Sequence, residues 1–216
     1  MKRRPVAGST RREQKAATRA ALLAAARRCF ERQGYAGTVV ADIAREAGVA
    51  HGTFYVHFAS REAAADALLE GFNDTLSREL APLLADVARP LAGIVAEAAR
   101  LFLGALDDDR ALVRFYAERA TSGLPAESLA TGINPPALAA LTSALVARAG
   151  ADERRHVDLA AHGLLALWLR VGLRYVLVPG TRRAEAEAVL VELTSGALAN
   201  LISPSARTRR TTARAR

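Results

Sequence analysis

The chain has 216 residues, of which 51% are hydrophobic and 5% aromatic, which is enough for one large or two small domains with a buried core. Its single cysteine, Cys29, excludes an internal disulfide and a cysteine-based zinc site. The formal net charge of +8 is concentrated at the two ends of the chain. Residues 1–62 carry 12 basic and 5 acidic side chains, residues 63–202 carry 13 and 17, and residues 203–216 carry 5 and none.

The first ten residues lack the apolar stretch of a signal peptide. The most apolar later stretch, 163–178, is interrupted by Arg170 and Arg174 and is short of a membrane span. We therefore expect a cytoplasmic protein with no membrane partner. The sequence lacks the common motifs of catalysis and of metal or phosphate binding: the order Ser-His-Asp, the HExxH motif, a metal-spaced histidine pair and a phosphate-binding glycine loop. We expect no catalytic residue, no metal and no cofactor, and an enzyme or a lipid carrier is the least favoured class.

The chain starts with a basic segment, 1–14, which is expected to be a disordered arm along DNA phosphates. The first predicted helix covers about 18–33 and ends at Gly34. Its apolar stripe includes Cys29, which is expected to be a buried, inert thiol.

Two short helices around a tight turn are predicted within 38–58. Thr38 is a suitable N-cap for the first helix, and Gly48 is placed to end it in the left-handed conformation. Phe54 and Phe58 are four residues apart, so both turn inward. The outer surface of the second helix then carries His51, Gly52, Thr53, Tyr55 and His57. This is the build of a helix-turn-helix that inserts one helix into the major groove of DNA.

The residues themselves resemble a known family. Asp42-Ile-Ala-Arg-Glu-Ala-Gly-Val49, Gly52-Thr-Phe-Tyr-Val-His-Phe58 and Ser60-Arg-Glu62, in this order, are similar to the DNA-binding domain of the TetR (tetracycline repressor) family. The resemblance covers roughly 15–72. It implies an all-α protein with an N-terminal three-helix DNA-binding domain, about 15–75, and a C-terminal helical domain for effector binding and dimerisation, about 76–203.

By matching positions, the resemblance implies that the DNA contacts come from the second motif helix and the two flanking helix starts. His51 is the first choice for reading a base edge, Gly52 allows close approach, and Thr53 offers a hydroxyl or a methyl group. Alternatively, His57 is a structural hydrogen-bonding residue and Tyr55 is partly packed. Ala50 stands where such proteins often carry Ser or Thr, and this removes a capping side chain. The complete expected set is Thr38, His51, Gly52, Thr53, Tyr55, His57 and Arg61.

Six further helices are predicted, at about 60–87, 90–106, 109–121, 135–149, 152–178 and 182–202, followed by a disordered basic tail, 204–216. Pro82 is expected to interrupt the first of them. Asp107-Asp108-Asp109 is interpreted as a helix cap rather than a cation site. The longest internal loop candidate is 122–133.

The last two helices, about 152–202, are long and apolar and are joined by a short turn, so they form an antiparallel pair. The resemblance implies that this pair forms the interface of a two-fold homodimer; an ordinary monomer core is the alternative. Arg170 and Arg174 share a face, where an ion pair across the dimer or an exposed rim is favoured over an anion clamp.

The effector cannot be named from the sequence. The candidate cavity residues are Phe102, Phe115, Tyr116, His162 and Trp168. For the four aromatic residues other than His162, plain core packing is the favoured alternative. The leading hypothesis is a homodimeric, ligand-responsive repressor on a palindromic double-stranded operator. The alternative is a constitutive or architectural DNA-binding protein without a small-molecule effector.

Overall fold

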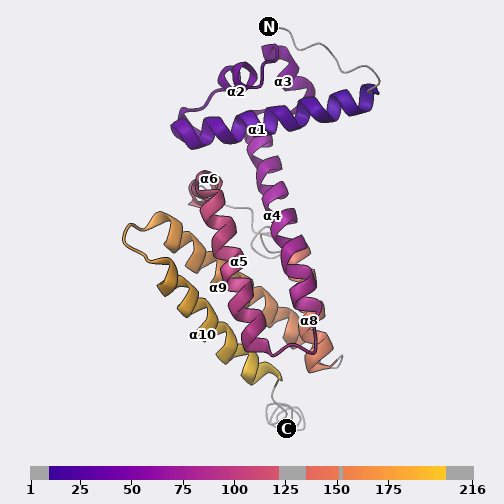
Figure 1. Cartoon of the computed structure of the whole chain (residues 1–216), viewed down its shortest axis with the longest axis vertical. Helices are drawn as coiled ribbons and strands as arrows, with labels where there is room; N and C mark the ends of the chain where they lie inside the picture. Colours follow the sequence, from indigo (N-terminus) through magenta and orange to yellow (C-terminus); the bar gives the residue numbers. More distant parts are fainter. Residues whose placement is uncertain (1–9, 122–134, 151–152, 203–216) are drawn as a thin grey trace. The chain divides into compact units, whose positions relative to one another are not determined.

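The computed structural model describes residues 10–121, 135–150 and 153–202, and all regular secondary structure in these ranges is helical (Figure 1). The all-α prediction is therefore confirmed. The chain divides into two compact units between Gly71 and Phe72, four residues before the predicted boundary. Each unit has its own core.

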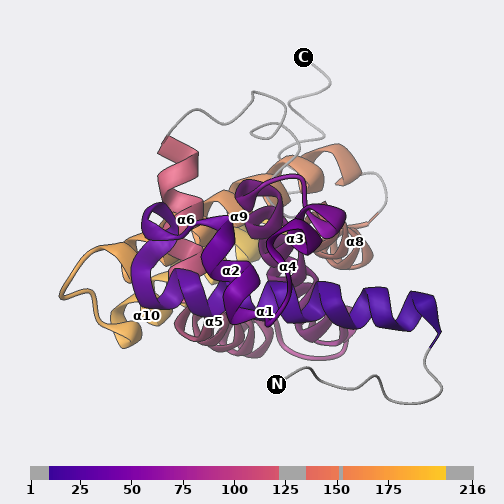
Figure 2. The ribbon, with the colours of Figure 1, turned by 90° about the horizontal axis from the view of Figure 1, so that it is seen from above.

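The N-terminal unit contains α1 (Arg11–Gly37), α2 (Val40–Glu46), α3 (His51–His57) and the first part of α4 (Arg61–Ala85). Within this unit α2 lies against α1, and α3 lies against α2 (Figures 1 and 2). Its core is small and tightly closed, and Cys29 is buried in it as predicted. The buried side chains are Leu22, Ala25, Ala26, Cys29, Phe30, Ile43, Ala44, Phe54, Phe58, Ala64 and Ala65.

The first helix begins earlier than predicted, so the expected disordered arm, 1–14, is wrong for its last four residues. Thr10 and Glu13 form a capping box: the Thr10 N–H donates to the Glu13 carboxylate at 2.7 Å, and the Glu13 N–H donates to Thr10 Oγ1 at 3.2 Å. These bonds satisfy two backbone donors at the helix start. At the other end, Gly34 has φ 73°, so the helical run to Gly37 contains a kink at the predicted stop.

The C-terminal unit contains the rest of α4 together with α5 (Leu91–Asp108), α6 (Arg110–Thr121), α8 (Pro135–Ala149), α9 (Arg154–Leu177) and α10 (Arg183–Ile202). Helices α9 and α10 form the predicted antiparallel pair, with α5 against α10 and α8 against α9 (Figure 1). Trp168 of α9 packs against three clusters of the core of this unit. It is the only tryptophan of the chain.

One local prediction in this unit is wrong: helix α4 continues through Pro82 to Ala85, although a proline inside a helix removes a hydrogen bond to the carbonyl four residues earlier. Of the three aspartates expected to cap the next helix, Asp109 directly precedes α6, and its carbonyl accepts from the Val113 N–H at 3.1 Å. Asp107 lies in the last turn of α5 instead. Its carboxylate accepts hydrogen bonds from Arg110 at 2.6 Å, Tyr175 at 2.8 Å and Arg183 at 2.9 Å. We call Asp107 and these three donors the Asp107 hub.

The predicted loop 122–133, the tail 204–216 and the first nine residues of the arm lie outside the described residues. Within the described ranges, no helix is both long enough and apolar enough to span a membrane.

Candidate nucleic-acid interface and ligand cavity

The turn between α2 and α3 is fixed by backbone hydrogen bonds. The Gly48 N–H donates to the Arg45 carbonyl at 3.1 Å, and the Val49 N–H donates to the Ala44 carbonyl at 3.0 Å. With Gly48 at φ 71°, this is a Schellman motif, in which the left-handed residue favours glycine. Ala50 then precedes α3 without a side-chain cap, as the sequence indicates. The turn therefore sets the direction in which α3 leaves α2.

Helix α3 has one buried and one exposed face. Phe54 and the following Phe58 are buried, as predicted, and their rings lie 5.6 Å apart. His51 and Tyr55 are exposed one turn apart, with an edge-to-face ring contact at 5.4 Å. Gly52 lies beside them, and a Cβ there would meet no atom within 4 Å. The structure thus brings three of the expected contact residues together on one open face.

Thr53 and His57 lie at the edge of this face and are half-buried. The pKa of His57 is lowered from 6.5 by burial and by the nearby positive charges of Lys15 and Arg19. Helix α1 therefore supplies cations next to the end of α3. In contrast, Arg28 and Arg32 pair with Glu46, at 2.7 and 3.5 Å.

Two of the residues expected to contact DNA make hydrogen bonds within the protein. The Thr38 side chain is 0% exposed, and its hydroxyl donates to the Gly34 carbonyl at 2.8 Å. Val39, not Thr38, is the N-cap of α2, so a phosphate contact by the Thr38 hydroxyl is wrong. Arg61 donates to the carbonyls of Tyr35 at 3.0 Å and Thr38 at 2.6 Å.

The Arg61 guanidinium also lies over the Tyr35 ring, 4.1 Å from its centroid. It therefore closes the C-terminal end of α1, where carbonyl groups lack helical partners. Arg61 therefore has a structural role at the end of α1, and its contact with DNA stays a prediction.

The expected set omits two exposed apolar residues of the helix-turn-helix. Val56 is 65% exposed and follows Gly52 by one helical turn, and Val39 is 54% exposed at the start of α2. Exposed valines at these places can contact thymine methyl groups. The sequence could have indicated Val56. It follows Gly52 by four residues and therefore shares its face of the helix, whereas Phe54 and Phe58 occupy the buried face.

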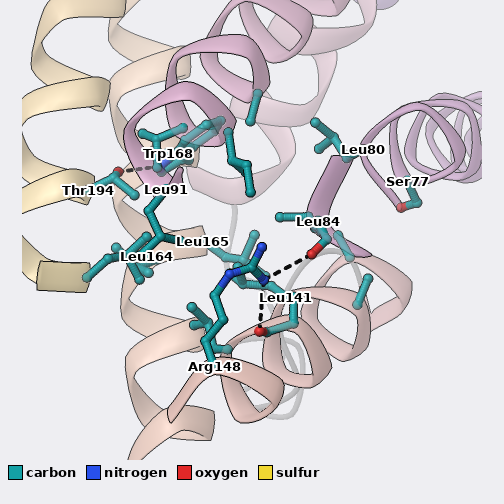
Figure 3. Close-up of a pocket in the computed structure, with 18 residues that line it drawn as sticks. Ser77, Leu80, Leu84, Leu91, Leu141, Arg148, Leu164, Leu165, Trp168 and Thr194 are labelled. Atoms are coloured by element: carbon teal, nitrogen blue, oxygen red, sulfur yellow. Dashed lines mark hydrogen bonds between the residues drawn. The ribbon is translucent and has the colours of Figure 1, made fainter. Parts of the chain in front are cut away.

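A cavity lies within the C-terminal unit, with a volume of about 80 Å³ (Figure 3). Side chains from α4, α5, α8, α9 and α10 surround it, and nearly all of the surface that they present is aliphatic. The polar lining residues are Ser77, Arg148 and Thr194.

Among the five expected ligand residues, Trp168 lines this cavity, and Phe102, Phe115, Tyr116 and His162 do not. Phe102 packs on the Trp168 ring at 5.5 Å, so it supports the cavity wall from behind. Phe115 and Tyr116 are buried on α6. The sequence showed no signal for the aliphatic residues and Arg148 that form the wall, because they look like ordinary core positions.

An apolar stripe lies exposed along α9 and α10. Leu159 is 72% exposed and Leu177 is 41% exposed on α9, and Val189 and Leu193 are 41% and 50% exposed one turn apart on α10. Arg170 and Arg174 lie at exposed positions of α9 between Leu159 and Leu177. Large apolar side chains exposed to this degree on two neighbouring helices are suited to contact a partner.

The sequence of residues 22–68 matches the family model of bacterial regulatory proteins of the tetR family. The chain is 41% identical over 73 residues to the transcriptional repressor KstR2 of Mycobacterium tuberculosis, a match that covers 34% of this chain and 36% of KstR2. The chain thus spans about a third of the length of this curated relative, and the match shows only its similarity in that part.

Solved structures show the fold over most of the chain. A TetR-family transcriptional regulator from Pectobacterium atrosepticum has a TM-score of 0.65 at 23% identity, covering 90% of this chain and 98% of its own. FadR of Thermus thermophilus, a TetR-family repressor in complex with lauroyl-CoA, has a TM-score of 0.61 at 19% identity, covering 81% and 92%.

Proposed function

We propose that this chain, which belongs to the TetR family, is a sequence-specific repressor of transcription that binds a palindromic operator as a homodimer and responds to a small-molecule effector. The observation that carries the proposal is the exposed face of α3. His51, Gly52 and Tyr55 lie open there, while Phe54 and Phe58 fix the helix to the core. Such a helix reads base edges in the major groove.

The electrostatics support the same interface. Lys15 and Arg19 of α1 lie close enough to His57 to lower its pKa, so positive charge borders the reading face. Cations beside a recognition helix attract phosphates and make binding depend on salt concentration.

The homodimer is proposed on the apolar stripe of α9 and α10. Two such helix pairs, related by a two-fold axis, bury Leu159 and Leu193 in a four-helix arrangement. Arg170 and Arg174 then lie in or beside the interface, where an acidic group of the second copy can pair with them. Glu192 is an exposed acidic residue of α10, next to Leu193 in sequence.

The effector is proposed to act through α4, which contributes to both units and whose second half lines the cavity with Leu80 and Leu84. A ligand that favours one position of this helix shifts the population between DNA-binding and released forms. KstR2 and FadR are both named as repressors, which favours repression over activation.

The test of DNA binding is selection of genomic fragments at physiological salt by three proteins: the wild type, the double variant His51→Ala/Tyr55→Ala, and the control His156→Ala. His156 is an exposed histidine of the C-terminal unit. We expect the wild type and the control to enrich one palindromic site that the double variant loses. Equal, unspecific retention of all fragments by the three proteins would support an architectural role instead.

The test of the dimer is the molar mass in solution. Leu193→Glu is expected to give a monomer, because it places a charge in the apolar stripe. Val87→Glu changes an exposed valine outside α9 and α10 and is expected to leave the dimer intact. A wild-type monomer would refute this part of the proposal.

A further inference from the structure

The chemistry of the cavity restricts the class of molecule that it can hold. Its wall is formed mainly by leucines and alanines of five helices, together with the Trp168 ring (Figure 3). Such a wall offers dispersion contacts and the release of water, and it offers no direction-specific bond by itself.

The polar groups at the wall already have partners within the protein. The Trp168 Nε1–H donates to Thr194 Oγ1 at 2.8 Å. The Arg148 guanidinium donates to the carbonyls of Leu84 and Ala144, each at 3.1 Å (Figure 3). It also donates to the carbonyl of Asp86 at 2.6 Å. Ser77, the remaining polar residue, is not without a partner either.

An ionised ligand is therefore disfavoured with either sign of charge. The described lining residues include no carboxylate that could balance a cation. An anion at Arg148 would compete with its bonds to three backbone carbonyls, of which two lie at the C-terminal end of α4. A part-buried carbonyl that loses its donor costs about 1–3 kcal/mol, so this competition offsets part of the gain from pairing the anion.

The volume adds a limit on size. A cavity needs about 10–15 Å³ of such space for the centre of one water molecule, so about 80 Å³ accommodates roughly 5–8 non-hydrogen atoms. A longer molecule would extend beyond this space.

We propose that the effector is a small, uncharged, predominantly aliphatic molecule, with neither an ionised carboxylate nor an amine. This inference rests on the proposed function, since it names the ligand class of the effector cavity. It predicts that an alcohol or hydrocarbon binds, and that the acid and the amine of the same chain length do not bind comparably.

The experiment compares hexan-1-ol, hexanoate and hexylammonium at pH 7 by titration of the full chain, with Trp168 fluorescence and calorimetry as readouts. Trp168 lines the cavity and is the only tryptophan. We expect hexan-1-ol to bind at least tenfold more tightly than either ion. Ala140→Phe fills the lined space and is expected to abolish binding. Ala139→Phe, at an exposed neighbouring position of α8 that does not line the cavity, is expected to leave it unchanged.

The proposal would be overturned if hexanoate bound as tightly as hexan-1-ol and lost that binding in Arg148→Met. It would also be overturned if hexylammonium bound most tightly, or if none of the three probes bound. Release of DNA is measured separately on the selected operator. Hexan-1-ol that binds in the cavity without changing operator affinity would refute the effector role, while the assigned ligand class would stand.

Discussion

Gly172 of α9 allows a sharp test of how closely the helices of the C-terminal unit pack. A Cβ at this position would lie 2.7 Å from a methyl carbon of Leu106 and 2.8 Å from the Phe102 ring, both on α5. These distances are too short for any carbon pair, so Gly172→Ala must displace at least one of the two side chains. Phe102 in turn packs on Trp168 of the cavity wall.

The expected magnitude follows from two opposing effects. Overpacking of a dense core costs about 1–3 kcal/mol, whereas replacing a helical glycine by alanine gains about 1 kcal/mol. The matched control is Gly104→Ala on α5, where a Cβ would meet only the Arg183 side chain, at an ordinary 3.7 Å. Because the helix-propensity gain is common to both variants, Gly172→Ala should be about 1–3 kcal/mol less stable than Gly104→Ala.

The assay is urea unfolding followed by Trp168 fluorescence, which reports on the C-terminal unit. A second readout is the affinity for hexan-1-ol, which should fall in Gly172→Ala alone, since displaced Phe102 pushes on Trp168. If both alanine variants are stabilised equally over the wild type, the close packing of α9 on α5 is wrong.

Three further predictions concern the N-terminal unit. Arg61→Gln removes bonds from a charged donor to the carbonyls at the end of α1, so it should lower the free energy of unfolding by about 1.5–3 kcal/mol. The stability of Arg61→Lys should lie between that of Arg61→Gln and the wild type. Thermal unfolding followed by circular dichroism measures both variants, and a lysine variant as stable as the wild type would contradict the role of the guanidinium group. Glu62 accepts a hydrogen bond from the Tyr35 hydroxyl at 2.7 Å. This bond is the largest of several, including those from the Glu62 backbone, Ser60 and Arg61, that together lower the pKa of Glu62 from 4.5 to about 2. The stability from this bond is thus present above about pH 4.5 and is lost as the pH falls toward 2. The difference in free energy of unfolding between the wild type and Tyr35→Phe should therefore shrink over this range in acid titrations. A difference that does not change with pH would argue against the bond. Burial raises the pKa of the Cys29 thiol. Its reaction with a disulfide reagent at pH 8 should therefore be at least about a hundredfold slower in the native protein than in urea. Equal rates would mean that Cys29 is accessible in the native protein.

The helix-turn-helix could be predicted closely because its signals are local. Gly48 supplies a left-handed residue, and Phe54 and Phe58 share a face by spacing alone. The roles of Thr38 and Arg61 could not be predicted, because both depend on the end of α1. Arg61 reaches carbonyls 23 and 26 residues away in sequence, and no local pattern marks such a partner.

The cavity was harder to predict for a related reason. Leu80, Leu84 and Leu141 have the periodicity of ordinary core residues, and whether a core position faces a neighbour or a void depends on how five helices meet. Trp168 was found because large aromatic residues with a polar atom are conspicuous. Phe102 was expected at the cavity and lies one layer behind it.

The Asp107 hub has a consequence for the order of folding. Its bonds from Tyr175 and Arg183 span 68 and 76 residues of the chain, whereas the bond from Arg110 spans three. Closing such long loops is entropically costly, so contacts of this range form after the local helices. During synthesis, Asp107 remains without two of its donors until α9 and the start of α10 have been made. The hub therefore closes the C-terminal unit only when the chain is nearly complete.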